Sequence, residues 1–480
     1  MIIGAEIRKN RSENSSLKAA GFYDDALNFI GHATGYPTDS KNKPSGNQDL
    51  STEVGFFANA NYMYNNRYYA DFVYRLSGSS KFGSNQRYGQ FWSGGLGWNL
   101  HNENFLKFEK LNLLKIRGSV GYTGKVNFEP FQSITMYKYE NTLEYLHGIG
   151  AIPQTIGNDD LKWEREFSYN IGADISLFDR RLNATLDFYL KRTKDLVLDA
   201  SIAPSTGVVS GKQNIGEMEN KGFEFSVDGF IIQRNDVWWQ LGMNGSTNKN
   251  RILKISNALK RQNELNNDVA PTRQTPAPLA QYEEGESTSA LKVVRSAGID
   301  PATGREVFIK LDGTRTFTYS ADDKVVVGDT DPRFYGNVYT NVFYKGFSLY
   351  IMGSFKCGGY LYNVPRASRV EGTTGRTNVD RRAFDSRWKE VGDIALYRKI
   401  TEHSVPQQTD RFVEKENVLT ITSVNLGYEF PQRICQKMML RNLRLGVNLS
   451  DILRFSNVKV ERGLDYLYGN GFEFTLSTTF

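Results

Sequence analysis

The last ten residues of the chain, 471–480, alternate between apolar and polar side chains. Successive side chains of a β-strand point to opposite faces, so this segment forms a strand with one apolar and one polar face. About 9–11 residues with this pattern are enough for a strand to cross a bilayer. The same pattern also fits an edge strand of a soluble β-sandwich, so the rest of the chain has to decide. The apolar face carries Phe472, Phe474, Leu476, Thr478 and Phe480.

The same alternation recurs along the whole chain and predicts about 14 antiparallel strands. The connections between them alternate between short turns and long polar stretches. A soluble sandwich has no reason to keep one edge short and the other long, whereas a membrane barrel has short periplasmic turns and long extracellular loops. The predicted tight turns are Asn65-Asn66, Asp179-Arg180 and Lys345-Gly346, and the predicted long loops are 11–51, 124–163, 248–333 and 358–417.

Composition agrees with a barrel whose strands are apolar on one face only. Hydrophobic residues make up 39% of the chain, and the mean hydropathy is −0.48. Without a run of about 18 apolar residues, a helical membrane span is excluded. Aromatic residues crowd the predicted short turns, where an interfacial girdle belongs. The net charge of +6 arises from interspersed charges rather than from a basic tract, so nucleic acid is not an expected partner.

The two faces of the predicted strands differ in charge. A charged side chain that faces lipid costs about 2–4 kcal/mol at the bilayer midplane, and the apolar faces carry almost none. Backbone groups without partners cost several kcal/mol in hydrocarbon, so the strands have to pair around a closed wall. The polar faces then line a lumen. Their charged residues include Arg117, Asp174, Asp187, Glu224 and Asp228.

The sequence carries no recognisable catalytic or metal-binding arrangement. The histidines form no HExxH pattern, and Cys357 and Cys435 form no CxxC. A surface hydrolase would need a nucleophile and a base, and no such pair is marked. We therefore expect no cofactor, no metal and no enzymatic activity. The sequence Asp329-Thr330-Asp331-Pro332 fits either a turn or a Ca²⁺ contact.

Several stretches have the order and spacing of a known family. Residues 76–83 read Leu-Ser-Gly-Ser-Ser-Lys-Phe-Gly and are followed by Trp98 on the next predicted strand. Together with the other stretches they resemble the SusC/RagA-like TonB-dependent transporters, over nearly the whole chain. Leu76 and Ser77 depart from the family, which has Arg and Asp there. The other similar stretches are 114–124, 161–164, 214–224, 298–304, Arg387-Trp388, and 426–428 followed by Pro431.

This resemblance implies an all-β fold, an antiparallel transmembrane β-barrel of about 22 strands with long extracellular loops. It also implies an N-terminal plug, a TonB box coupled to TonB-ExbB-ExbD, and a SusD-like surface lipoprotein. The location is the outer membrane of a Gram-negative bacterium, with lipid around the barrel. The implied function is import of nutrient oligomers. Glycans are favoured and oligopeptides are possible, because loops rich in aromatic and polar residues suit both.

Two other functions remain open, and three loop residues are predicted to contact substrate or partner. The chain could instead form a passive porin, or a surface receptor or adhesin without energised transport. The very long loops 248–333 and 358–417 offer a rim on which the lipoprotein could dock. Within them, Arg387, Trp388 and Tyr397 are the predicted contacts with substrate or partner. The alternative role of these three residues is packing of the loop.

The first residues, Met1 to Glu6, have neither a charged nor an apolar signal region. Residues 1–480 are therefore predicted to be the C-terminal portion of such a barrel, without the plug and the early strands; the alternative is a cytoplasmic protein. With roughly eight strands of the barrel missing, two strand edges would lack partners. We expect either a curved open sheet or a smaller closed barrel in which 1–10 pairs with 471–480.

Overall fold

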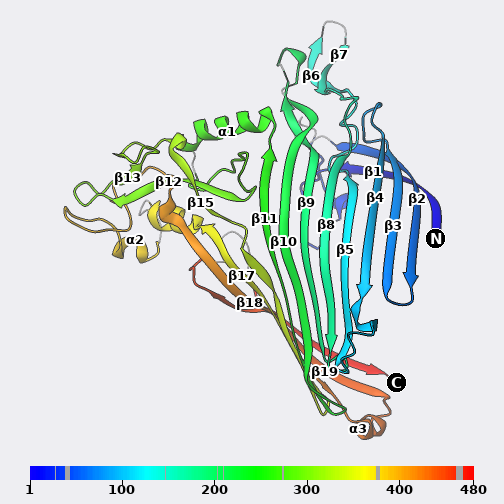
Figure 1. Ribbon diagram of the computed structural model, residues 1–480. Helices are drawn as coiled ribbons and strands as arrows, with labels where there is room; N and C mark the ends of the chain where they lie inside the picture. Colours follow the sequence, from blue (N-terminus) through cyan, green and yellow to red (C-terminus); the bar gives the residue numbers. More distant parts are fainter. Residues whose placement is uncertain are drawn as a thin grey trace.

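The computed structural model describes residues 1–26, 29–37, 44–145, 148–202, 204–208, 210–272, 275–373, 379–460 and 469–479. Fourteen strands of this part form one antiparallel sheet, which confirms the predicted fold class (Figure 1). Phe480 and His147 lie outside the described residues. In their order across the sheet, the strands are β1 (Ile2–Ser16), β2 (Ser45–Tyr64), β3 (Tyr68–Ser79), β4 (Tyr88–Asn99), β5 (Leu111–Lys125), β8 (Glu164–Leu177), β9 (Leu182–Ser201), β10 (Ser210–Arg234), β11 (Val237–Lys254), β16 (Phe334–Tyr344), β17 (Phe347–Tyr362), β18 (Val413–Glu429), β19 (Asn442–Ser456) and β20 (Gly471–Thr479).

The tight turns lie where the sequence predicts them. Asn65 and Asn66 have φ of 48° and 54°, and Lys345 and Gly346 have φ of 47° and 92°. Positive φ at both central residues gives a hairpin turn whose twist matches that of the flanking strands. Asn and Gly tolerate this conformation because their side chains are small or absent.

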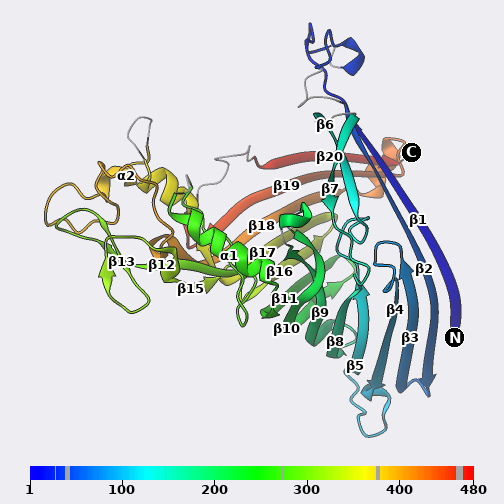
Figure 2. The same ribbon diagram turned by 90° about the horizontal axis from the view of Figure 1, so that it is seen from above.

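The sheet is strongly curved and open (Figure 2). Its edge strands are β1 and β20, and within the described ranges these two strands do not pair with each other. Of the two outcomes expected from the sequence, the structure therefore has the open sheet and not a small closed barrel.

One face of the sheet is apolar and exposed along its whole width. Phe56 lies opposite Leu76 and Val447 opposite Phe474, so the alternation is in register from strand to strand. Phe474 on the last strand is 80% exposed. Apolar residues that are exposed together over so many strands indicate a face that contacts lipid. Other exposed members are Tyr62, Phe72, Leu96, Ile171, Phe188, Leu426 and Leu445.

The connections do not alternate in length as strictly as the sequence suggests. The connection 100–110 lies on the turn side, yet it is longer than 80–87 and 202–209 on the opposite side. The connection 430–441, also on the turn side, contains the short helix α3 (Gln432–Lys437). The side on which each connection lies still alternates, because every strand is antiparallel to its neighbours.

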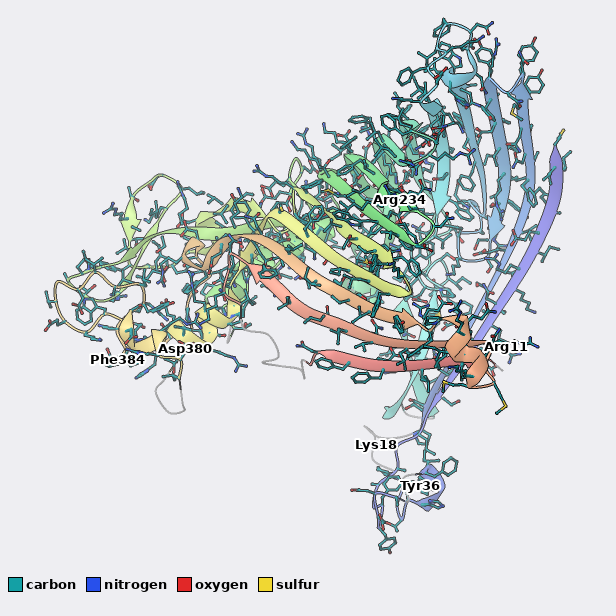
Figure 3. All side chains as sticks on the ribbon, turned by 90° about the horizontal axis from the view of Figure 1, so that it is seen from below. Arg11, Lys18, Tyr36, Arg234, Asp380 and Phe384 are labelled. Carbon is teal, nitrogen blue, oxygen red and sulfur yellow. The ribbon has the colours of Figure 1, made fainter. Side chains whose placement is uncertain are left out.

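The predicted long loops are shorter than expected and largely structured. β1 continues to Ser16, β11 to Lys254 and β17 to Tyr362, so strand pairing extends into segments that look like polar loops. Polar residues pair as well as apolar ones here, because ladder hydrogen bonds use the backbone. The segment that follows β1 carries Lys18 and Tyr36 away from the sheet (Figure 3). The loop 124–163 contains a hairpin of β6 (Met136–Tyr145) and β7 (Gly148–Thr155) that projects beyond the neighbouring strands (Figure 1).

The described residues of the two longest loops fold together into one body, which we call the loop module and define as residues 255–272, 275–333, 363–373 and 379–412. Long connections without structure are uncommon in compact proteins, because they leave backbone groups without partners. The module contains helix α1 (Asn257–Val269), a small sheet of β12 (Ala290–Ile299), β13 (Glu306–Ile309), β14 (Arg315–Thr316) and β15 (Lys324–Asp329), a π-helix (Arg366–Glu371) and helix α2 (Arg382–Asp385).

The module has a hydrophobic core of its own. Val293 of β12 is fully buried and packs with Ala367 and Phe412 from the second loop and with Tyr362 at the end of β17. The core therefore joins both loops to the sheet. None of the helices in the described ranges is long and apolar enough to span a bilayer. Seen from below, Asp380 and Phe384 of the module lie far from Arg234 at the end of β10 (Figure 3).

The stretch 76–83 packs under the loop that precedes β8. Phe82 is buried, and its ring centroid lies 4.3 Å from that of Trp163 and 5.3 Å from that of Phe128. A Cβ at Gly83 would lie 2.1 Å from the carbonyl oxygen of Asp159, so a side chain has no room there. The residues of this motif therefore pack against the loop that precedes β8 and hold the connection between β3 and β4 in place.

Candidate functional site

Arg387 lies inside the loop module, and among the described residues its side chain donates to backbone carbonyl groups alone. Its side chain contacts the oxygens of Ala383, Arg398, Val370 and Glu371 at 2.8–2.9 Å. The residue is 6% exposed, and burial lowers the pKa of its guanidinium. A guanidinium with five N–H donors suits such a position, because it can join three chain segments at once.

Trp388 joins two motifs that lie far apart in the sequence. Its indole Nε1 donates to the carbonyl oxygen of Pro301 at 2.9 Å, and its ring covers Gly304. A Cβ at Gly304 would lie 2.6 Å from the ring, and this glycine has φ of 67°. The β12–β13 turn is closed by Asp300, which accepts from the backbone N and the hydroxyl of Thr303. The Gly-Ile-Asp-Pro-Ala-Thr-Gly stretch and the Arg-Trp pair therefore form one contact between the two loops.

Tyr397 is buried beside Val370 and Ala383, and burial raises the pKa of its hydroxyl. It forms a parallel bridge with Arg387, and its carbonyl oxygen accepts from the backbone N of Trp388 at 3.1 Å. The structure thus brings the three predicted residues together and gives each of them packing contacts. Of the three side chains, that of Trp388 is half-buried while the others are buried. Contact of these residues with a substrate or partner stays a prediction.

Buried charges connect the two loops next to these residues. Arg411 donates to Glu306 from β13 at 2.8 Å and to Glu371 from the π-helix at 2.7 Å. Glu371 is 1% exposed and also accepts from Arg398 at 2.7 Å. Burial alone would lower the pKa of Arg411, but Glu306 and Glu371 hold it above its usual value. A buried charge is tolerated when it is paired in this way, so the network joins the two loops through ion pairs.

The module presents an exposed apolar loop, residues 388–396. Ile394 is 98% exposed, and Val391 and Leu396 are exposed beside it. The loop is nevertheless fixed: Asp393 accepts from the backbone N of Lys389 and of Glu390 at 2.9 and 3.0 Å. These bonds hold the pKa of the Asp393 carboxyl below its usual value. Exposed aliphatic side chains on a rigid loop are typical of a surface that binds another protein.

The polar face of the sheet carries a row of charged residues across β5 to β10, which we call the charged row. Arg117 donates to Asp187 at 2.6 Å and to Asp174 at 3.3 Å. Arg117 reaches Asp187 across Gly172, which lies between them in the row, so the ion pairs connect β5, β8 and β9. The row consists of Arg117, Gly172, Asp187 and Glu224, and Asp174 flanks it.

A second row on the polar face crosses β11 to β20 and is almost neutral; we call it the amide row. It adjoins a hollow of about 600 Å³ on this face of the sheet. Its members are consecutive Cα partners: Gln240, Asn341, Tyr350, Asn425, Asn448 and Glu473.

Sequence reasoning identified the charged residues of the polar face but missed the amide row. The signal that could have found it is the recurrence of Asn at polar positions of successive strands. Assembling those positions into a row also needs the strand register, because a slip by one residue moves a side chain to the other face.

The residues considered above for metal binding and for thiol chemistry make ordinary structural contacts. Within the described ranges, no three His, Cys, Asp or Glu side chains gather as a metal site. Cys357 and Cys435 are free thiols, one exposed and one buried. The carboxylate of Asp329 accepts from the backbone N of Asp331 at 3.0 Å, which is a turn contact.

Comparison with known proteins identifies relatives over nearly the whole chain. The sequence model of the family described as TonB dependent receptor-like, beta-barrel, matches residues 7–448. TonB-dependent receptor P3 of Formosa agariphila is 27% identical over 478 residues, which cover 95% of this chain and 46% of the relative. TonB-dependent receptor SusC of Bacteroides thetaiotaomicron is 35% identical over 214 residues, which cover 43% of this chain and 21% of SusC.

Solved structures share the fold. The RagAB peptide transporter superposes with a TM-score of 0.80 at 23% identity, covering 95% of this chain and 49% of that one. The chain spans about half the length of the matched RagAB chain and about half the length of the Formosa relative.

Proposed function

Because the chain belongs to the TonB-dependent receptor-like β-barrel family, we propose that it forms part of the wall of an energised importer. It is an outer-membrane β-barrel protein of the SusC type, and its proposed cargo is nutrient oligomers. The observation that carries the proposal is the two-faced sheet. An exposed apolar face suits lipid, and a polar face with a hollow suits a path for a polar solute.

Within this function we propose glycans as the cargo, ahead of oligopeptides. The support is the amide row, whose neutral side chains match hydroxyl groups without requiring charge on the ligand. RagAB is named a peptide transporter, so an oligopeptide is the competing cargo to be tested.

The proposed partner is a SusD-like surface lipoprotein that docks on the loop module. The support is the apolar loop 388–396, whose aliphatic side chains are exposed. Arg387 and Tyr397 flank this loop in the sequence, and together with Trp388 they pack within the module. Burial of exposed aliphatic side chains is the main favourable term in most protein association. Energy for import is proposed to come through TonB-ExbB-ExbD, as in the family to which the chain belongs.

Import is tested by deleting the gene and complementing it, with uptake measured over a panel of neutral oligosaccharides and oligopeptides. We expect uptake of at least one oligosaccharide to depend on the gene. Gene-dependent uptake of peptides alone would contradict the glycan assignment, and no dependence for any compound would contradict import.

Docking is tested with the double variant Ile394→Asp and Leu396→Asp, which places two charges on the apolar loop. We expect a lipid-anchored surface protein to co-purify with the wild-type protein from native membranes and to be lost from the variant. The control is Arg381→Asp, which changes charge at an exposed position outside this loop. Equal recovery from wild type, variant and control would contradict docking at 388–396.

A further inference from the structure

Three exposed cations gather on the apolar face of the sheet, at its loop-side border, and we call them the basic patch. Lys221 of β10 and Lys249 of β11 are direct Cα partners, and Arg251 follows two residues after Lys249 on the same face. Among the described residues, none of the three has a carboxylate within ion-pairing distance. Like charges directly opposite each other on neighbouring strands are destabilising, so the sheet itself gains nothing from this arrangement.

The carboxylates next to the basic patch leave it positively charged. Glu219 is the Cα partner of Arg251 on one side and of Arg192 on the other. Glu217 accepts from Arg192 at 2.6 Å and lies 3.8 Å from Lys194. With five cations for two carboxylates, the patch and its neighbours keep a net positive charge on the outward face.

An aromatic band lies directly below the basic patch on the same face. Phe223 stands two residues after Lys221 on β10, so the two side chains share a face. Aromatic side chains gather at the headgroup level of membrane barrels, so the band marks the border between acyl chains and headgroups. The band consists of Phe188, Phe223, Phe225, Phe334 and Phe355, whose consecutive ring centroids lie 4.6–6.0 Å apart.

The height of the basic patch agrees with this border. Gly229 lies beside the turn, opposite Leu182. Residues 221–229 cover about 27 Å along the strand at about 3.4 Å per residue. A strand tilt of about 40° reduces this to roughly 20 Å across the membrane, and the apolar band of a barrel is about 25 Å tall. Lys221 therefore stands near the upper border of the band, at the level of the headgroups.

We propose that the basic patch binds the phosphate group of a lipid in the extracellular leaflet, while the aromatic band contacts the acyl chains of the same lipid. Phosphate oxygens supply the negative charge that Lys221 and Lys249 lack, and a phosphate between these two ammonium groups relieves their repulsion. The apolar surface directly below the patch continues this contact along the lipid.

A lipid fits the basic patch better than a soluble anion does. Exposed ion pairs alone stabilise a complex only slightly, whereas a lipid adds the contact between its acyl chains and the aromatic rings. β10 and β11 lie in the middle of the sheet, away from both edge strands. The proposal does not depend on the cargo, so its failure would leave the import function standing.

The test uses the double variant Lys221→Gln and Lys249→Gln, purified in detergent from its native membrane. Gln removes the charge and keeps a polar side chain. The matched control is Lys191→Gln with Lys356→Gln, which removes the same charge from exposed positions on the polar face. Lys191 is the Cα partner of Asn220, the residue next to Lys221, so this control lies at the same height on the other side of the sheet.

Binding is measured by titrating the delipidated proteins with lipid A, with lipid A whose phosphate groups have been removed, and with inorganic phosphate. We expect wild type and control to bind lipid A equally, and the double variant to bind it about tenfold more weakly. Equal affinity of wild type and double variant for lipid A would overturn the proposal. Wild-type binding of the dephosphorylated lipid, or of inorganic phosphate, at the affinity of lipid A would also overturn it.

Thermal unfolding of the same proteins gives a second test. Without lipid, the double variant should be no less stable than the wild type, because the substitutions remove two opposed positive charges. Lipid A should raise the unfolding midpoint of wild type and control by several degrees and leave that of the double variant nearly unchanged. An equal rise in all three proteins would overturn the proposal.

Heat-modifiable gel mobility shows whether each variant is folded. If the double variant fails to reach the membrane, Lys249→Gln alone gives the same comparison, with an expected loss of affinity of several-fold. Unchanged affinity of that variant would overturn the proposal. Loss of a co-purifying protein from a variant that binds lipid A normally would overturn the lipid assignment and identify the patch as a protein contact.

Discussion

The charged row and the amide row lie on the same face of one sheet, but their polar side chains make different contacts. Both place polar side chains toward the inside of a wall whose other face is apolar. In the charged row, Arg117 pairs with both Asp174 and Asp187, so these polar groups contact one another. In the amide row, Asn341 makes no hydrogen bond to a described residue, and Asn425 donates to Ser423 at 3.2 Å. The comparison separates a part of the wall that is connected by ion pairs from a part whose polar side chains are mostly uncharged.

The largest effect is expected for Arg117→Met, which leaves two carboxylates without their cation. Breaking a buried pair typically costs 3–5 kcal/mol; the Arg117 side chain is 33% exposed, so we expect about 1–3 kcal/mol. The measurement is denaturant unfolding of the purified protein in detergent. Asn425→Leu in the amide row should change stability by less than about 0.5 kcal/mol. Equal losses in both variants would break the comparison.

A second prediction uses two glycines, one in each half of the polar face. A Cβ at Gly172 would lie 2.5 Å from Oδ1 of Asp187 and 2.8 Å from Cζ of Arg117. Gly172→Ala should therefore cost about 1–2 kcal/mol by disturbing the ion pairs.

The matched variant is Gly446→Ala, where the nearest atom, Cβ of Thr475, would lie 3.6 Å away. We expect no measurable loss of stability there. Unfolding curves of the two alanine variants that coincide would contradict the difference in packing between the two halves.

Salt should change the stability effect of a substitution in the charged row but not in the amide row, and this change is smaller than the effects above. Raising the ionic strength to about 1 M shortens the Debye length to about 3 Å and weakens partly exposed ion pairs. The stability difference between wild type and Arg117→Met should shrink by about 0.5 kcal/mol. For Asn425→Leu the difference should not depend on salt. The same unfolding assay at two salt concentrations measures both.

The smallest effect concerns a carboxylate outside both rows, Asp393, which backbone amides hold rather than arginine. Its folded pKa lies below the unfolded value of about 3.9, so the charged form stabilises the loop. That stabilisation is present above the unfolded pKa and is lost as the pH falls through the folded pKa. Hydrogen exchange at the backbone amides of Lys389 and Glu390, corrected for intrinsic rates, should show that protection decreases as the pH falls through this window in the wild type. In Asp393→Ala, the protection should not change with pH over the same window. Protection independent of pH would contradict the assignment.

The period-two alternation predicted the strands well, because side chains on a strand must face either lipid or water. The strands at 54–64 and 68–76 illustrate this, as Phe56 lies opposite Leu76 and Ala60 opposite Phe72 on one face, while Phe57 and Met63 are exceptions on the other face. The tight turn at Asn65 was also readable, since few residues accept positive φ.

The loop module and the amide row could not be predicted in the same way. The contact of Trp388 with Pro301 and the pairing of Arg411 with Glu306 join segments that are far apart in sequence, and no local pattern marks them. The motif marks Arg387, but the carbonyl oxygens that accept from its guanidinium belong to residues far away in the sequence, which no local pattern identifies. The amide row depends on the register of six strands, which depends in turn on every turn between them.

The central claim, energised import through this wall, is tested most directly by measuring accumulation of a labelled neutral oligosaccharide in cells with and without a protonophore. The account predicts gene-dependent accumulation that stops when the proton gradient collapses or when TonB is deleted. Surface binding in energy-depleted cells should persist. Gene-dependent entry that is unaffected by the protonophore would contradict the account and identify a passive pore. Surface binding that never leads to entry would instead identify a receptor or adhesin.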